Sequence, residues 1–175
     1  MKIHKTHQVI LLMVFLTFQA NAQEKGFDES VLSENGRQAY RTLLKTELFA
    51  IGPIYASAEV SVGERALDVL VGEKEAVPAL RALVEKAMPE GGLYALLGLQ
   101  KLEPDSFDKY LETFRKKPEL AERGDDFDKI PGGEVKRMDG CSGFTEKRTA
   151  VADAIKGGEF DFWFYEEWVK IKQQQ

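Results

Sequence analysis

The sequence predicts a mainly α-helical domain with a loop-rich C-terminal region, and two observations carry that prediction. Apolar residues recur at three- and four-residue steps through most of residues 34–117, the spacing that places side chains on one face of a helix. Residues 119–144 are instead rich in glycine and proline, which interrupt regular structure. We therefore expect one mainly helical domain over residues 34–175.

The composition of the chain is that of an ordinary globular protein, and its charge disfavours two classes of partner. Of its 175 residues, 43% are hydrophobic and 30% are charged, with 24 Lys and Arg against 29 Asp and Glu. These proportions exclude a collagen-like, low-complexity or disordered chain. The acidic balance disfavours nucleic acid and anionic membranes as partners, because both select for clustered basic side chains.

The first 22 residues have the layout of a secretory signal peptide. A basic start with Lys2 and Lys5 precedes an apolar run over residues 9–18, and the run ends at the small-x-small motif Ala20-Asn21-Ala22. The run is shorter than the ~20 residues that span a bilayer. We expect cleavage after Ala22 and a periplasmic or secreted protein without a membrane span. The mature chain then carries 22 basic against 29 acidic side chains, a net charge of −7.

The first helix is predicted from Glu34 to Ile51, after a polar segment, residues 23–33, that we expect to be a flexible lead-in. Gly52-Pro53 ends this helix, because proline cannot continue it. Its expected apolar face consists of Tyr40, Leu43, Leu44, Leu48 and Ile51.

The next two helices are delimited by capping and breaking residues. Ser61 and Glu64 fit a capping box at a helix start, and Gly72 is the expected stop. A further helix covers residues 73–88 and is expected to break at residues 89–92, Pro-Glu-Gly-Gly. The apolar stripe of the first of these two helices consists of Val62, Ala66, Val69 and Leu70.

Two more helices complete the expected core. Residues 93–102 are apolar nearly all round, which predicts a helix buried on several sides. Pro104 and Asp105 open the next helix and Pro118 closes it. The apolar face of that helix consists of Phe107, Tyr110, Leu111 and Phe114.

The C-terminal part is predicted to be less regular. A loop over residues 118–144 has room for a short strand at 134–138, and Thr145 is the expected N-cap of a helix that ends at Lys156. The aromatic residues after Gly158 fit both strand and helix spacing. A short β-ribbon that joins residues 134–138 to residues 160–164 is compatible with this pattern.

The segment from Ala76 to Leu102 resembles the paired helices of HEAT-like repeats. The matching positions are Ala76-Val77-Pro78-Ala79-Leu80 in the first helix and Ala95-Leu96-Leu97 in the second. The resemblance covers about residues 62–117 and implies HEAT-like antiparallel helical pairs. The chain departs from a true solenoid because no period of ~40 residues recurs three or more times.

The whole mature chain is also similar to a group of secreted bacterial proteins to which no activity is assigned. That group pairs a Leu-Tyr-Ala-Leu-Leu-Gly-Leu-like helix, here Leu93–Leu99, with a downstream Gly-Cys segment, here Gly140-Cys141. This resemblance implies a helical fold and export, and it implies no particular chemistry.

The residue inventory excludes several chemistries. Both histidines, His4 and His7, lie in the signal peptide, so the mature chain has no imidazole for Ser-His or Cys-His catalysis or for zinc. One cysteine, Cys141, permits no internal disulfide or thiolate zinc site. The chain has no nucleotide-binding glycine motif; Gly91-Gly92 is only a helix break. We expect no cofactor and no metal site, and we favour a non-catalytic role.

Cys141, in the sequence Asp-Gly-Cys-Ser-Gly, is the single residue of most interest. It is compatible with a reactive thiol, with an intermolecular disulfide that forms a homodimer, and with a buried cysteine that packs as a small hydrophobe. Burial is the commonest of the three environments for cysteine.

Carboxylates offer two further candidate sites. Asp125, Asp126 and Asp128 precede two glycines and Glu134, but they match an EF-hand loop poorly. A pair such as Glu134 and Asp139 would suit acid/base hydrolysis of a glycan. The alternative to a non-catalytic role is therefore a carboxylate-based hydrolase or binder of envelope glycans.

The aromatic tail supplies the candidate binding residues Trp163, Tyr165 and Trp168, since tryptophan and tyrosine are enriched in binding hot spots. The alternative is that these rings pack on the helical core and are buried. The leading prediction from the sequence is an exported, non-catalytic protein-interaction module with a protein partner in the cell envelope.

Overall fold

The computed structural model describes residues 26–55, 59–125 and 128–161. The described chain is mainly helical, with six α-helices, a three-stranded mixed sheet and a two-stranded ribbon. This confirms the predicted mainly α class, and the described residues show no repeat. The signal peptide and the candidate residues Trp163, Tyr165 and Trp168 lie outside the described residues.

The helices and strands have the following bounds. The helices are α2 (Glu34–Lys45), α3 (Val62–Val71), α4 (Ala76–Lys86), α5 (Pro89–Leu102), α6 (Phe107–Arg115) and α7 (Arg148–Lys156), with 3-10 turns η2 (Glu29–Val31) and η3 (Pro104–Ser106). The strands are β1 (Phe49–Ala50), β2 (Pro53–Ile54), β3 (Glu59–Val60), β4 (Glu134–Asp139) and β5 (Ser142–Lys147).

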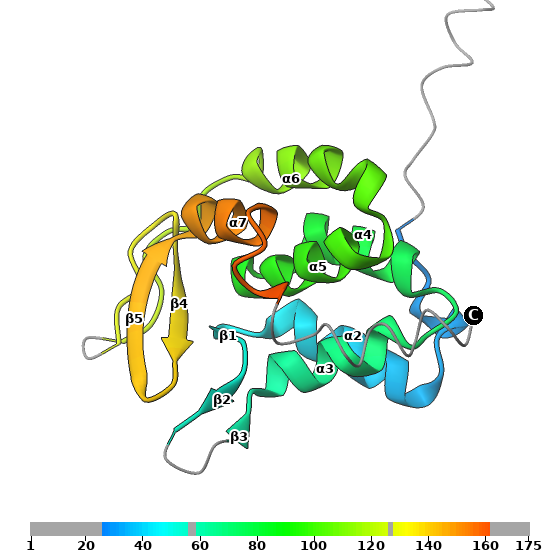
Figure 1. Cartoon of the computed structure of the whole chain (residues 1–175), viewed down its shortest axis with the longest axis horizontal. Coiled ribbons are helices and arrows are strands. Elements are labelled where there is room, and N and C mark those ends of the chain that lie inside the picture. Colours follow the sequence, from blue (N-terminus) through cyan, green and yellow to red (C-terminus); the bar gives the residue numbers. More distant parts are fainter. Residues whose placement is uncertain (1–25, 56–58, 126–127, 162–175) are drawn as a thin grey trace, which may run out of the picture.

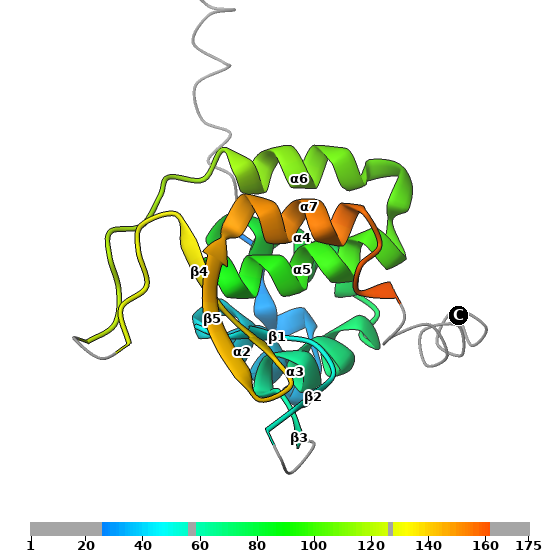
Figure 2. The ribbon, with the colours of Figure 1, turned by 60° about the vertical axis from the view of Figure 1, so that its left-hand side comes forward.

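Helix α5 is the centre of the fold. Every residue from Pro89 to Leu99 is buried, which confirms the prediction of a helix covered on several sides. Helices α6 and α7 lie on one side of the α4–α5 layer, and α2 and α3 lie on the other (Figures 1 and 2). The result is a helical core in three layers, with the sheet at one end.

The sheet has the order β1-β4-β5, with β4 in the middle. Strand β4 runs parallel to β1, where Phe49 pairs with Arg137, and antiparallel to β5 through six residue pairs from Glu134–Lys147 to Asp139–Ser142. The predicted strand at 134–138 is therefore confirmed. Its two edges pair with β1 and β5, so the ribbon with residues 160–164 that the sequence pattern allowed does not form at the described residues 160 and 161. Phe160 lies in a turn and packs its ring edge-on against Phe49.

The first predicted helix ends six residues early, at Lys45 instead of Ile51. Thr46 is extended, and the backbone then enters β1, where Phe49 and Ala50 are buried and pair with β4. The helical spacing of Leu48 and Ile51 was thus coincidental. Burial in a sheet that forms with residues almost 90 positions away overrides the local pattern.

The expected break at residues 89–92 lies inside α5. Pro89 occupies the first turn, where its missing N–H costs nothing, and Met88 is the N-cap. Gly91 allows α5 to approach α2 closely, because a Cβ there would lie 1.8 Å from the carbonyl oxygen of Leu43. These residues therefore permit a tight helix crossing and do not end a helix.

The start of α7 also differs from the prediction. Thr145 lies in β5, and α7 begins at Arg148 after Lys147. The strand β5 was not predicted, because its residues are exposed and polar and carry no hydrophobic alternation.

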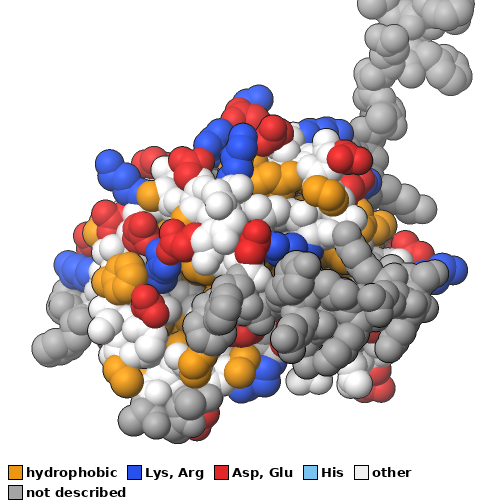
Figure 3. Space-filling view, in the orientation of Figure 1, with side chains coloured by type: hydrophobic (Ala, Val, Ile, Leu, Met, Phe, Trp, Pro, Cys, Tyr) orange, Lys and Arg blue, Asp and Glu red, His pale blue; other side chains and the backbone are white. Residues whose placement is uncertain are grey.

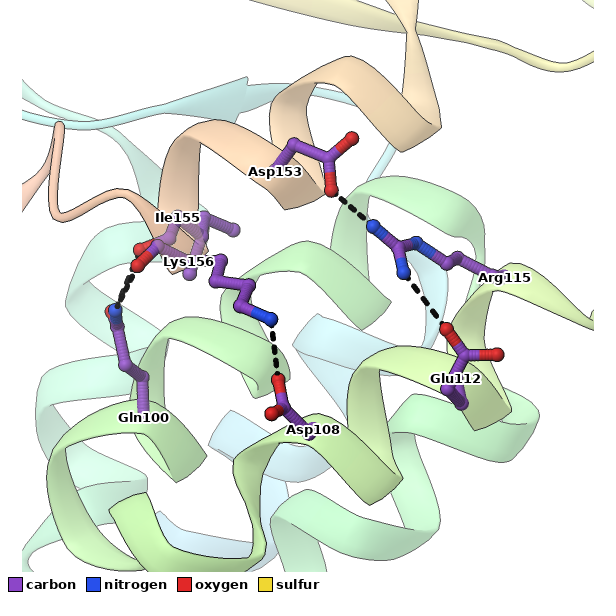
Figure 4. Close-up of polar contacts among 7 residues, drawn as sticks. All are labelled: Gln100, Asp108, Glu112, Arg115, Asp153, Ile155 and Lys156. Atoms are coloured by element: carbon purple, nitrogen blue, oxygen red, sulfur yellow. Dashed lines mark hydrogen bonds and ion pairs between the residues drawn. The ribbon is translucent and has the colours of Figure 1, made fainter.

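Polar contacts fasten α7 to the rest of the core (Figure 4). Lys156 Nζ pairs with Asp108 Oδ1 of α6 at 2.8 Å, and Arg115 of α6 pairs with Asp153. The side-chain amide of Gln100, on α5, donates to the carbonyl oxygen of Ile155 at 2.6 Å. Helix α7 is therefore held by both α5 and α6.

The segment expected to be a lead-in contacts the core where it is described. The Phe27 ring lies 5.3 Å from the Tyr40 ring, and Leu32 is 3% exposed. Asp28 caps η2 by accepting from Ser30 N at 3.0 Å. No helix in the described ranges is long and apolar enough to cross a membrane.

Candidate functional site

Three adjoining hollows lie along α2, the start of α3 and the β2–β3 ribbon. Their volumes are about 700, 220 and 240 Å³, and Val62 lines all three. The largest runs along α2, the second lies between α2 and α3, and the third lies under the ribbon. We define the Val62 surface by nine residues, each of which lines at least one of these hollows: Arg37, Arg41, Thr42, Lys45, Tyr55, Val60, Val62, Arg65 and Val69.

Apolar side chains stand open to solvent on the Val62 surface. Val62 is 61% exposed, Tyr55 52%, Val69 43% and Val60 37%. These four are more than half of the large hydrophobic residues exposed in the described chain, the others being Val31, Leu120 and Phe144. A cluster of this kind beside hollows is typical of an interaction site, whereas a single exposed valine needs no explanation.

The exposure of Val62 and Val69 corrects the predicted stripe of α3. Ala66 and Leu70 are buried as expected, but the buried face of α3 is centred on Leu67 and Val71. Helix α3 has more apolar residues than one face can bury, so two valines remain outside. Sequence reasoning missed the site for this reason, although the excess of apolar residues on a ten-residue helix was the available signal.

Basic side chains border the apolar part. Arg37, Arg41 and Lys45 recur every four residues along α2 and therefore share a face. Arg41 is paired with Glu29, whose pKa is lowered by that hydrogen bond. On α2 the largest hollow is lined by these three basic side chains and one acidic one, Glu34, and we call this lining the basic wall; Val62 also lines the hollow.

A buried polar cluster holds the ribbon side of the surface in place. Tyr94 Oη lies 2.9 Å from Ala50 N and 2.8 Å from Ala50 O, and the Ser61 hydroxyl lies 2.9 Å from Tyr94 Oη. Ser61 Oγ also donates to Ala50 O at 3.0 Å. Burial raises the pKa of Tyr94 to about 12, so the phenol is neutral at physiological pH.

The predicted capping box at Ser61 is half confirmed. Ser61 Oγ accepts from Glu64 N at 3.0 Å, as expected, but the Glu64 carboxylate does not return to Ser61. It accepts instead from Gly52 N at 2.8 Å and fixes the chain just before β2. Burial raises the pKa of Glu64, against the lowering effect of that hydrogen bond. The cluster of Ser61, Glu64 and Tyr94 therefore positions backbone behind the Val62 surface.

Cys141 is exposed, so the reading of it as a buried packing residue is wrong. It lies in the two-residue turn between β4 and β5, after Gly140, whose φ is +55°. A glycine with positive φ at the first turn position is typical of a type II′ hairpin. The backbone N–H of Tyr55 donates to Gly140 O at 3.0 Å, so this turn adjoins the β2–β3 ribbon.

The carboxylate candidates do not converge. Glu134 and Asp139 lie five positions apart on β4, so their side chains point to opposite faces of the sheet. Asp128 pairs with Lys136, and the described residues hold no group of three or more side chains suited to a metal ion. Asp126 lies outside the described residues.

Comparison of the chain with protein families, with curated proteins and with solved structures finds no match.

Proposed function

We propose that this chain is an exported protein-interaction module and that it binds its partner through the Val62 surface. The observation that carries the proposal is Val62 itself, which is 61% exposed at the junction of three hollows. Burying apolar side chains of this kind in a complex is favourable by ~25 cal/mol per Å² of apolar area. The rigid support from Ser61 and Tyr94 favours a preformed site.

The chemistry of the surface indicates the chemistry of the partner. An apolar segment would cover Val62, Val69 and Tyr55, and acidic residues beside it would face the basic wall on α2. Charges of both signs are interspersed on the face shown in Figure 3, and no large patch of a single charge is visible there. Charge complementarity to a partner would therefore involve individual side chains and not a whole face. The proposed partner is a protein segment with apolar anchors and flanking carboxylates.

The test is capture of partners from the cell envelope with the wild-type protein and a Val62→Glu variant as baits, after crosslinking. The proposal predicts a reproducible envelope protein on the wild-type bait that is depleted on the variant. Equal recovery on both baits would place the binding elsewhere.

Export remains part of the proposal and has its own test. Lys2, Lys5, the apolar run and Ala20-Asn21-Ala22 support it. Mass spectrometry of the protein from the periplasm or medium should find a mature N-terminus at Gln23. An unprocessed chain that stays in the cytoplasm would contradict export.

Three finer predictions also stay proposals. The two-residue connection between α4 and α5 and their mutual packing support HEAT-like pairing for that one pair. The exposure of Cys141 supports a disulfide-linked homodimer, which a non-reducing gel would show and Cys141→Ser would abolish. The aromatic set Trp163, Tyr165 and Trp168 is proposed as a second contact area, testable by alanine substitution in the same capture experiment.

A further inference from the structure

Strand β5 is an edge of the sheet that the described residues leave open. Within residues 26–55, 59–125 and 128–161 it pairs only with β4, and the opposite edge, β1, is just two residues long and buried. All six residues of β5 are exposed or half-buried, and none is proline. Natural sheets usually blunt such an edge with proline, a bulge, charged side chains or a covering segment, since it invites pairing with another chain. The charged side chains of β5, Glu146 and Lys147, stand at its C-terminal end, and residues 142–145 are uncharged.

The backbone groups that face outward can be identified from the register. Arg148 N donates to Gly133 O at 3.1 Å, and Glu134 pairs with Lys147. In an antiparallel ladder, hydrogen-bonded and non-hydrogen-bonded pairs alternate. The N–H and C=O groups of Ser142, Phe144 and Glu146 therefore face β4, and those of Gly143, Thr145 and Lys147 face outward.

Phe144 gives this edge an apolar contact. It pairs with Arg137 on β4, and both side chains lie on the sheet face that also contains the buried Val135. The Phe144 ring is 42% exposed, and the Arg137 guanidinium lies 5.7 Å from its centroid. A terminal nitrogen of Arg137 pairs with a carboxylate oxygen of Glu146 at 2.9 Å. This ion pair fixes the guanidinium against which the Phe144 ring packs.

We propose that two copies of this chain associate through β5, with the strands antiparallel and Phe144 opposite the partner's Phe144. In this register Thr145 and the partner's Gly143 exchange backbone hydrogen bonds, as do Gly143 and the partner's Thr145. The two phenylalanine rings meet at the two-fold axis, at the kind of pair where side chains approach most closely.

The side-chain pairs across β5 are the reason that the occupant is a second copy in this register. The outward groups pair only in registers that differ by two residues. A shift of two places Phe144 opposite the partner's Ser142 or Glu146 and so loses the contact between the two rings. A shift of four residues would place Glu146 opposite the partner's Glu146, a repulsive pair. In the proposed register Glu146 lies opposite the partner's Ser142 and keeps its ion pair with Arg137. No like charges face each other across the β5 strands.

The proposed dimer differs from a disulfide dimer through Cys141. In the antiparallel register Cys141 lies opposite the partner's Lys147, six residues from the partner's Cys141, or about 20 Å along the strand. A disulfide needs Cα atoms within about 7 Å. The β5 dimer therefore forms without a disulfide and survives Cys141→Ser.

The first test is sedimentation equilibrium of the purified protein in reductant, from about 10 μM to about 1 mM, because an interface this small binds weakly. We expect a reversible monomer–dimer equilibrium. Thr145→Pro removes one outward N–H and no ladder bond, and should weaken dimerisation at least about tenfold. The matched variant Thr145→Val keeps that N–H and should change the constant by less than about twofold. A monomer at all concentrations, or equal effects of both variants, would overturn the proposal.

The second test fixes the register by crosslinking in a Cys141→Ser background. A chain with Ser142→Cys and Glu146→Cys together should form covalent dimers on oxidation, because these positions face each other across the two-fold axis at a distance that a disulfide spans. Each single variant should form no covalent dimer, since the two equivalent positions lie about 13 Å apart. Covalent dimers from the single variants, or none from the double variant, would contradict the register.

Discussion

At the scale of single residues, Gly91 determines how closely the two central helix layers approach. A Cβ at this position would lie 1.8 Å from the Leu43 carbonyl oxygen and 3.1 Å from the Ala87 side chain. The atom in the way is backbone, which cannot rotate aside as a flexible side chain would. The glycine is therefore required by packing and not by its backbone dihedrals, since it sits within a regular helix.

We predict that Gly91→Ala destabilises the protein by at least about 1–3 kcal/mol, because α5 must move away from α2. The matched control is Gly72→Ala, at the C-cap of α3. There φ is −79° and the nearest atom to a new Cβ is 3.5 Å away, so the change should be neutral or slightly stabilising. Urea unfolding measures the free energy of unfolding of both variants. Equal stabilities would contradict the explanation that Gly91 is required by helix packing.

Lys117 provides a prediction about pH. Its ammonium group donates to the Ala87 carbonyl oxygen at 2.7 Å, at the end of α4, and burial together with the nearby Arg148 lowers its pKa to about 8. Between pH 8 and the unfolded pKa, 10.5, the folded state holds fewer protons at this site than the unfolded state does. The Lys117 contribution to the free energy of unfolding therefore rises with pH across this interval.

The measurement is the difference in unfolding free energy between wild type and Lys117→Met, followed from pH 7 to pH 10. Since methionine does not titrate, the wild type should gain stability relative to the variant as the pH rises. A constant difference would mean that the fold does not shift the pKa of Lys117, and a difference that falls with pH would mean that the fold raises it; either result would contradict the prediction.

At the scale of elements, one buried ion pair joins α5 to the segment before β4. Glu90 is fully buried in the first turn of α5, and it accepts from both terminal nitrogens of Arg123, at 3.0 and 2.8 Å. Its carboxylate also accepts from Lys136 N at 3.1 Å, on β4. Arg123 further bridges to Ile130 through two backbone hydrogen bonds. This contact organises a region that the sequence predicts only as loop.

Arg123→Ala should cost about 3–5 kcal/mol of stability, because it leaves Glu90 buried and unpaired. Arg115→Ala removes an arginine whose partners, Glu112 and Asp153, are solvent-exposed, and should cost at most about 1 kcal/mol. Thermal or chemical unfolding of the pair tests the difference. A comparable loss in both variants would show that burial of Glu90 contributes little.

The elements also show how far sequence patterns reach. The faces of α2, α4 and α6 follow from apolar periodicity, and the buried α5 follows from its uniform composition. Strand β1 could not be predicted, because its two residues are strand only through pairing with Arg137 and Met138. Strand β5 is exposed and lacks an apolar pattern, so only its partner β4 identifies it. Local patterns thus predicted the helices and β4, and long-range pairing determined β1 and β5.

At the scale of the whole molecule, the candidate site arises from an excess of apolar residues. Leu67, Leu70 and Val71 of α3 are buried in the core. Val62 and Val69 of the same helix are exposed, and they lie beside the basic wall of α2. The sequence shows these residues on one helix but not which of them the core excludes. The predicted Trp163, Tyr165 and Trp168 lie outside the described residues, so they remain a separate proposal.

The most direct test of the central claim compares two valines in one binding measurement. Val62 is 61% exposed on the Val62 surface, and Val31 is 55% exposed on η2 and lines none of the three hollows. Titration of the captured partner against Val62→Glu and Val31→Glu, with unfolding controls, measures both affinities. Our account predicts at least about a tenfold loss of affinity for Val62→Glu, or ~1.4 kcal/mol, and no change for Val31→Glu. Unchanged affinity for Val62→Glu, in a protein of normal stability, would contradict it.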